Sequence, residues 1–458
     1  MGRDEYKQTL EWIDFSERNA AKSRVRAHVV SERRRRLSWE EGRMMRALRE
    51  RSRTGKPPVH GDLPHSKPAA LQPLPAQLSM SHQEWLSSGF LGVLIKYDVT
   101  GQGLEAYATY LPDIVRLVGT NSALDDAVAV FSTCYAGRPD SIETIRAYGR
   151  ALRSLRECLS IPQQASSTDT LCAAMLLGLY GSLFPRSRLG VLSHHEGVSK
   201  IIEYRGPGRH RTGFEQQLVI SHWAANIMSS LFRGQGCYLE SEKWREIFCP
   251  TSIRHINQFD LFLCQIFEGM TTLPGTLRDF RALKRANGHS KLPGHLKSRL
   301  DSYHVILNRI GCVVEDLLSQ GITATTVPSV RFPSIVDESF SFRDRSTAML
   351  YVLHWTFSLV VQGLIYTCSP YPTTPQTSAQ IYVRRIYMSY DYARSFPPYF
   401  SSYMLLPLVA AVAFDENDSK AWVMTAINDL YSENFQASSD DFPLNAHLLD
   451  SLISCLRV

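Results

Sequence analysis

The stretch from Asp140 to Pro207 constrains the fold most, because helix boundary signals and helix periodicity agree along it. Asp140 with Glu143 forms a capping-box pattern, in which side-chain oxygens satisfy free N–H groups at a helix start. Apolar residues then recur every three or four positions, as on one helix face, and Pro162 follows that helix. These apolar residues are Ile142, Ile145, Tyr148, Leu152, Leu155 and Leu159.

Two further helices are expected in the same stretch. The polar cluster 166–169 starts one of them, and Ser193 with Glu196 forms a second capping box for the other. Gly206 and Pro207 end the last helix, because Gly adopts the left-handed conformation past a helix end and Pro cannot continue a helix. Three amphipathic helices in series must bury their apolar faces. The stretch therefore predicts an all-α core.

The rest of the chain continues the helical pattern. No Asn-Gly or Asp-Gly hairpin lies between alternating apolar runs, so strands are not expected. The hydrophobic content of 44% is sufficient for a large core. We predict a multi-helix body over residues 81–458, with no Pro-rich linker inside it. Further helix candidates span 122–135, 214–232, 261–267, 300–318 and 381–396.

Two segments precede this body. Residues 57–80 contain six prolines between Pro57 and Pro75, which forbid a continuous helix and predict an extended, semi-rigid linker. Residues 1–56 form a basic arm. From Arg18 to Lys56 there are 14 Lys and Arg against 4 Asp and Glu, a net charge of +10, so the remaining chain carries −4 of the total +6. A basic arm on a mildly acidic body indicates a partner for the arm such as a polyanion or an import factor.

The arm contains four consecutive arginines, Arg33, Arg34, Arg35 and Arg36. Four in a row exceed what one solvated helix face needs, so we interpret the run as a nuclear import signal or a phosphate contact. A basic leucine zipper is rejected, because after Leu37 and Met44 the next heptad position is Arg51 and the linker begins soon afterwards.

The apolar stretch 348–368 is long enough to span a bilayer. It contains His354, Thr356, Ser358 and Gln362, and no flanking charge asymmetry favours insertion. We therefore interpret it as a central helix of the body and expect no membrane association.

Catalytic and metal-binding patterns were sought along the chain. No two of the nine cysteines have a C-x-x-C spacing, so no zinc cluster can form locally. His194-His195-Glu196 departs from the zincin pattern, because Ser199 stands where a second histidine is needed. Its expected role is structural, with Glu196 capping the helix, one histidine packed and the other in solvent. We expect no cofactor, no metal and no enzymatic activity.

The same stretch resembles a known family. The matching residues are His194-x-x-Gly197-Val198 and Ile201-Ile202-x-x-Arg205-Gly206-Pro207, followed by Tyr238-Leu239, Trp244 and a late Leu405-Leu406-Pro407-Leu408. They are similar to segments of the fungal-specific transcription factor domain, the helical regulatory region that usually follows a binuclear zinc cluster. Val25-Arg26-Ala27-His28-Val29 and the arginine run resemble the basic segment common in that group. The zinc cluster itself is missing from this sequence.

The resemblance implies a nuclear transcriptional regulator that acts through protein partners or dimerisation, for example in secondary metabolism or nutrient use. It implies a coregulator or dimer partner, weak or indirect nucleic-acid binding, and room for a small-molecule effector among the helices. In this interpretation His194, Gly197, Arg205, Gly206, Pro207 and Trp244 are structural motif residues. The alternative is a helical ligand-binding or scaffold protein with no direct promoter role. Arg205, Arg209 and Arg211 could bind an anion, but an exposed loop is the simpler interpretation.

Overall fold

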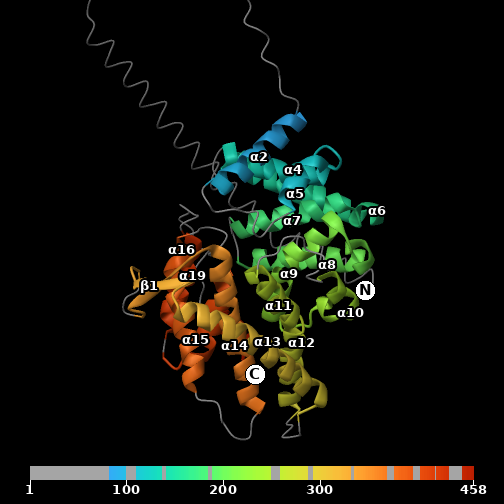
Figure 1. Cartoon of the computed structure of the whole chain (residues 1–458). Helices are drawn as coiled ribbons and strands as arrows, with labels where there is room; N and C mark the ends of the chain where they lie inside the picture. The colour runs from blue at the N-terminus through green and yellow to red at the C-terminus, as the bar shows by residue number, and fades with distance from the viewer. Residues whose placement is uncertain are drawn as a thin grey trace, which may run out of the picture.

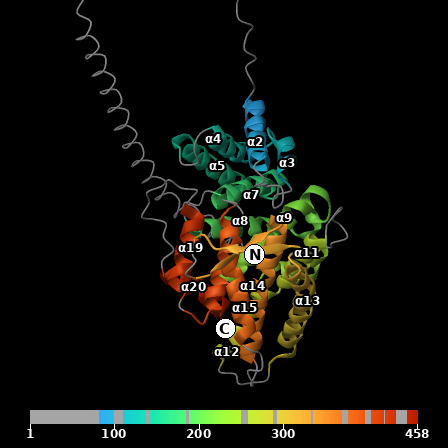
Figure 2. The same cartoon turned by 60° about the vertical axis from the view of Figure 1, so that its left-hand side comes forward.

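A computed structural model shows a body built almost entirely of helices, with one small β-hairpin (Figures 1 and 2). The prediction of an all-α fold is thereby confirmed. The structure describes residues 82–99, 110–136, 141–183, 188–248, 258–286, 292–331, 335–368, 376–395, 403–417, 419–432 and 446–457. The predicted arm (1–56) and linker (57–80) lie outside these residues.

The elements follow one another along the chain with short connections. The helices of the first half are α2 (His82–Val99), α3 (Leu111–Ile114), α4 (Ser122–Ala136), α5 (Ile142–Ser160), α6 (Pro162–Ala165), α7 (Thr168–Leu183), α8 (Arg188–Arg205), α9 (Gly213–Arg233) and α10 (Glu242–Arg245). Those of the second half are α11 (Gln258–Met270), α12 (Leu273–Arg285), α13 (Gly294–Ser319), α14 (Arg345–Cys368), α15 (Gln376–Met388), α16 (Tyr390–Arg394), α18 (Leu405–Phe414), α19 (Lys420–Ser432) and α20 (Ala446–Leu456). Short 3₁₀ turns are η2 (Val115–Leu117), η3 (Pro207–His210), η4 (Tyr238–Glu240) and η5 (Glu246–Phe248).

The helices of the first half follow chain order along the body, and the last helices return beside its middle, where α20 contacts α9 (Figures 1 and 2). The first helices, α2, α4, α5 and α7, pack together at one end, coloured blue to green (Figures 1 and 2). Helices α8 and α9 follow in the middle, and α11 to α15 with α18 to α20 form the other end. Helix α9 contacts α8 on one side and α11, α12 and α20 on the other, so it joins the two ends.

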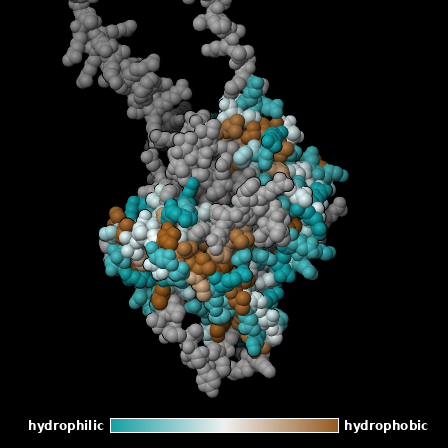
Figure 3. All heavy atoms as spheres, viewed as in Figure 1, coloured by the Kyte–Doolittle hydropathy of each residue, from teal (hydrophilic) through white to brown (hydrophobic). Residues whose placement is uncertain are grey.

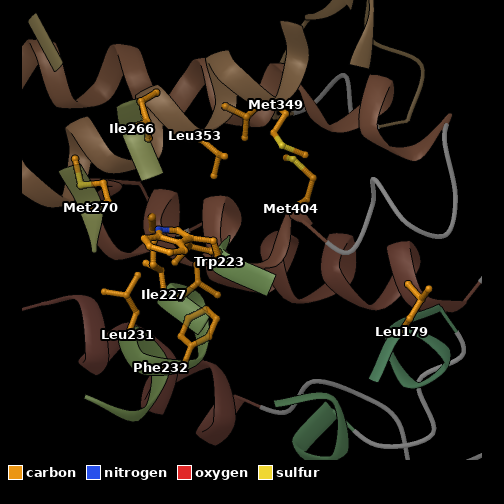
Figure 4. Packing of buried hydrophobic residues seen from close by; sticks show 14 of the residues in the cluster. Leu179, Trp223, Ile227, Leu231, Phe232, Ile266, Met270, Met349, Leu353 and Met404 are labelled. Atoms are coloured by element: carbon orange, nitrogen blue, oxygen red, sulfur yellow. The ribbon is translucent and has the colours of Figure 1, made fainter. Parts of the chain in front are cut away.

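One connected cluster of buried apolar residues runs through the described part of the body, from Leu86 in α2 to Leu456 in α20. Figure 4 shows its centre, where Trp223 of α9 points towards Ile266 and Leu353 from α11 and α14. Trp223 is 1% exposed, so its indole is fully removed from water. Large aromatic side chains at such positions contribute much of the hydrophobic stabilisation of a helical core.

Helix α14 forms the middle of the second end. Its segment Arg345–Tyr366 is the one described helix that is long and apolar enough to cross a membrane, with a mean hydropathy of 1.6. In the structure 83% of the apolar 18-residue window within that segment is buried inside the protein. The residues predicted at 348–368 therefore form a central core helix, as the sequence analysis expected for this stretch.

Two predicted helix boundaries are wrong. Ser141, rather than Asp140, caps α5, because its side-chain oxygen accepts the N–H of Thr144. Helix α8 begins at Arg188, so Ser193 lies inside it and Glu196 caps nothing. The Glu196 carboxylate instead forms ion pairs with Lys200 at 3.0 Å and with Arg233 of α9.

The hairpin was not predicted from the sequence. Strand β1 (Ala324–Pro328) pairs antiparallel with β2 (Glu338–Phe342), with Ala324 opposite Phe342. The strands are joined by residues 329–337, which contain none of the short turn signals that identify a hairpin in sequence. β2 packs on α14, α15 and α16, and β1 lies at the periphery (Figure 1).

Candidate functional site

Several residues on which the expected family resemblance rests gather at one junction between helices. Arg205 is the last residue of α8, and Gly206 and Pro207 make the turn into η3. Trp244 lies forty residues later, in α10, and its ring packs against His210 of η3 with ring centroids 5.9 Å apart. The structure therefore brings most of the motif into a single place.

The Arg205 side chain is the centre of this junction and is 2% exposed. Its Nε donates to the backbone oxygen of Ser166 at 3.1 Å, and its Nη2 donates to Thr168 Oγ1 at 3.2 Å and to Glu215 Oε1 at 2.7 Å. Ser166 lies just before α7, Thr168 is the first residue of α7, and Glu215 lies in the first turn of α9. The guanidinium thus ties three helices together, and the expectation that Arg205 lies in an exposed loop is wrong.

Glu215 completes the junction from the side of α9. Burial alone raises the pKa of this carboxyl, but hydrogen bonds from His210, Arg205 and Thr168 outweigh it and lower the pKa to about 2. His210 Nδ1 lies 3.1 Å from the backbone oxygen of Glu215 and 3.3 Å from its Oε2. Glu215 therefore stays ionised and holds the buried arginine in place.

The turn after α8 requires glycine for its backbone. Gly206 has φ = +75°, and its N–H donates to the carbonyl of Ile202 at 3.2 Å. A Cβ at this position would meet nothing within 4 Å, so the constraint is conformational rather than steric. Gly197, by contrast, lies in the helix interior with open space at its Cβ position, and nothing in the structure explains a glycine there.

His194 belongs to a second contact, between α5, α7 and α8. Its Nε2 lies 2.7 Å from the hydroxyl of Tyr148. Gly181 of α7 faces the imidazole so closely that a Cβ there would lie 3.1 Å from His194 Cδ2. Burial lowers the pKa of His194 to about 4, so the ring is neutral at physiological pH. This histidine is a packing residue.

The sequence analysis expected one histidine of the pair in solvent, and His195 is not fully exposed. It is half-buried, and its ring packs against that of His222 in α9 with centroids 5.4 Å apart. Burial lowers the pKa of His195 to about 3 and that of His222 to about 4. Ser199 Oγ lies 3.2 Å from His222 Nε2, but its own hydroxyl donates to the backbone oxygen of His195 at 2.8 Å. The serine hydrogen is therefore directed to the backbone rather than to a base.

The flanking arginines are placed differently from Arg205. Arg209 is exposed and its Nη1 donates to the backbone oxygen of Ser166 at 2.5 Å. Arg211 is exposed and lies 3.4 Å from Glu246. Within the described ranges, no group of three or more His, Cys, Asp or Glu side chains is arranged to hold a metal ion. Arg33–Arg36 lie outside the described residues.

The junction residues that the sequence analysis missed are Ser166, Thr168, His210 and Glu215. Thr168 and Glu215 are 47 residues apart, so no local pattern connects them. The only local signal was the carboxylate of Glu215 near the start of an expected helix at 214–232, ten residues after Arg205.

Comparison with known proteins assigns the chain to no family. No family model and no solved structure matches the chain. A protein of Emericella nidulans described as uncharacterized is 29% identical over 132 residues. The matched part is 28% of this chain and 28% of that protein, so most of both chains lies outside the match.

Proposed function

We propose that this chain is a nuclear transcriptional regulator of the fungal-specific class, whose helical body acts through protein partners or dimerisation. The observation that carries the proposal is the placement of the motif residues. Arg205, Gly206, Pro207 and Trp244 lie at one buried junction, where each has a structural role. Residues that define a fold rather than a reaction are those expected to persist in a regulatory domain.

The charge distribution supports the same proposal. Residues 18–56 of the arm carry a net +10 and the remaining chain −4, so the basic charge is concentrated outside the helical body. A basic segment is suited to import factors and phosphates. No metal, cofactor or reaction is part of this proposal.

Nuclear entry is tested with a fluorescent fusion of the full chain. Changing Arg33, Arg34, Arg35 and Arg36 to alanine should abolish nuclear enrichment. The matched control changes Arg43, Arg46, Arg49 and Arg51 to alanine, which removes the same charge from the same arm. Equal nuclear signal for both variants would contradict the import role of the run.

A promoter role is tested by chromatin immunoprecipitation of the tagged full chain, compared with transcript changes on deleting its gene. We expect enrichment at a defined set of promoters whose transcripts change on deletion. Normal nuclear entry without promoter enrichment would overturn the proposal in favour of a helical ligand-binding or scaffold protein. The two experiments therefore separate import from regulation.

A further inference from the structure

Positive charge within the helical body is concentrated in one segment. Residues 278–299 contain seven Lys and Arg residues against a single Asp, a net charge of +6. Residues 81–458 as a whole contain 33 Lys and Arg residues and 34 Asp and Glu residues, so the body carries −1 and its remainder −7. Charge gathered in this way creates a local positive potential, which attracts a negatively charged partner.

The described parts of this segment belong to two antiparallel helices that meet at one corner of the body. Arg299 of α13 lies 3.9 Å from Asp279 of α12, and its Nη1 donates to Thr276 Oγ1 at 3.3 Å. α12 ends at Arg285 and α13 begins at Gly294, so both helices extend about two turns beyond this contact. The end of α12 and the start of α13 therefore lie together. Figure 1 shows α12 and α13 at the end of the body opposite α2.

Three cations of the segment have structural partners. Arg278 lies 2.8 Å from Asp279, and Arg299 pairs with the same carboxylate from the other helix. Arg281 donates to the backbone oxygen of Cys455 in α20. These contacts hold α12 against α13 and α20, so packing explains these three arginines without a ligand.

Three other cations, Lys284, Arg285 and Lys297, form what we call the basic corner. All three are exposed, and none forms an ion pair with another residue that the structure describes. Burial lowers the pKa of Arg281, and the nearby charge of Arg285 lowers it further, so positive charges repel one another here. The basic corner therefore carries positive charge that the described part of the protein does not balance.

The helix dipole accounts for only two of these cations. Lys284 and Arg285 lie in the last turn of α12, where the dipole favours positive charge. Lys297 lies within the first four residues of α13, where the dipole disfavours it. No acidic residue and no side-chain cap neutralises that helix start, so its free N–H groups add to the positive potential. A cation placed against the stability of its own helix indicates a role in binding.

The basic corner has no apolar or aromatic anchor. Ten large hydrophobic side chains are exposed among the described residues, and none of them lies in 278–286 or 292–299. Hydrophobic residues do reach the surface elsewhere, as over α2 near the top of Figure 3, where Trp85 and Leu91 are exposed. Protein partners bind mainly through buried aromatic and Arg anchors, and single-stranded nucleic acids stack their bases on aromatic side chains. The corner therefore suits a ligand that is recognised through its charge.

We propose that the basic corner binds the phosphate backbone of a double-helical nucleic acid. A duplex carries one charge per about 1.7 Å of its axis, whereas a fully acidic extended peptide carries one per about 3.3–3.6 Å. Contacts to phosphates position a protein without reading the base sequence, so they need no recognition helix. This contact is additional to the one proposed for the arm, and it does not depend on a role in transcription.

The salt dependence of duplex binding by the full chain tests the corner. The corner variant combines Lys284→Gln, Arg285→Gln and Lys297→Gln. Each phosphate contact contributes about 0.9 to the slope of log affinity against log salt concentration, so the variant should reduce the magnitude of the slope by about 2–3. All three side chains are exposed, so thermal unfolding should be close to that of the unchanged chain. An unchanged slope would overturn the proposal.

A matched control removes the same net charge from elsewhere on the body. It changes three arginines to glutamine, each of which is paired with an aspartate: Arg116, Arg343 and Arg384. The slope for this control should remain that of the unchanged chain. An equal reduction in the control and the corner variant would show an effect of total charge and would reject the site.

Lysine footprinting of the unchanged chain tests the same contact without any variant. At low salt, a short duplex should slow the acetylation of Lys284 and Lys297 but not that of Lys420, which pairs with Asp450 in a different part of the body. Poly-glutamate at the same charge concentration should protect the two lysines less, because its charge density is lower. Equal protection by poly-glutamate would overturn the proposal in favour of an acidic protein segment. Absence of protection by the duplex would exclude the corner as a phosphate site.

Discussion

At the scale of single residues, the buried arginine of the motif is the most sensitive position. Arg205→Ala leaves the partly buried Glu215 carboxylate without its cation, and breaking such a pair costs about 3 kcal/mol. Arg211→Ala is the matched control, since Arg211 and Glu246 are 61% and 56% exposed. The control should lose less than about 0.5 kcal/mol. Urea denaturation measures the free energy of unfolding of both variants. Equal losses of this free energy would contradict the structural role of Arg205.

Three histidines, of which His222 is buried and His194 and His195 are half-buried, make a second prediction at this scale. The pKa values of His194, His195 and His222 are lowered to about 4, 3 and 4 in the folded protein, below their ordinary value of 6.5. The unfolded chain therefore binds protons first as the pH falls. The contribution of these histidines to stability should be constant above about pH 6.5 and decrease steadily towards pH 4. The loss of unfolding free energy between pH 6.5 and pH 4 should be smaller in a His194→Gln, His222→Gln double variant. Urea denaturation at each pH measures this free energy. The same pH dependence in the variant and the unchanged chain would contradict the prediction.

Single residues also show how far sequence patterns reach. The motif identified Arg205 and Trp244, because a family pattern records which residues are kept. The motif did not identify Ser166, Thr168 or Glu215 as the hydrogen-bond partners of Arg205. Contacts between residues tens of positions apart arise from how helices pack, and neither periodicity nor capping signals contain that information.

At the scale of elements, Gly197 inside α8 and Gly206 directly after it should respond to alanine in opposite directions. Gly206→Ala places a Cβ on a backbone with φ = +75° and should destabilise the protein by about 1 kcal/mol. Gly197→Ala lies inside the helix with open space around it and should stabilise the protein by up to about 1 kcal/mol, through higher helix propensity. Thermal unfolding of both variants measures the difference. A stabilising Gly206→Ala, or a clearly destabilising Gly197→Ala, would contradict this account of the helix end.

Helix ends were predictable where the signal is local. Ser167 Oγ accepts the N–H of Thr170 at the start of α7, inside the polar cluster expected there, and Gly234 ends α9 with φ = +64°. The start of α8 was not predictable, because the Ser193 and Glu196 pattern imitates a cap while Glu196 pairs with Arg233 of another helix. The hairpin was missed because its connection is long and lacks a short Asn-Gly or Asp-Gly turn signal.

At the scale of the whole molecule, the continuous core predicts how the chain resists proteolysis. Buried residues connect Leu86 to Leu456 in one cluster, so we expect the body from about residue 80 onwards to behave as one unit. Limited proteolysis should cut first between Lys56 and Leu78, in the Pro-rich segment. Mass spectrometry identifies the fragments. Early cleavage into two stable halves within the body would show that it consists of two units.

The charge of the whole chain predicts its behaviour with DNA. Sequence-specific binding needs side chains presented to base edges by a preformed element, and no close-spaced cysteines here form the zinc cluster that does so in the resembling family. The basic segment 18–56 of the arm, with a net +10, supplies only a counterion-release contribution, which falls steeply with salt. Purified alone, the chain should bind a promoter duplex and a scrambled duplex similarly at low salt, and both much more weakly at physiological salt. A salt titration of both affinities measures this. Specific binding typically exceeds non-specific binding by about a thousandfold or more, so a promoter preference above roughly a hundredfold at physiological salt would contradict the prediction and indicate a DNA-reading element within the chain.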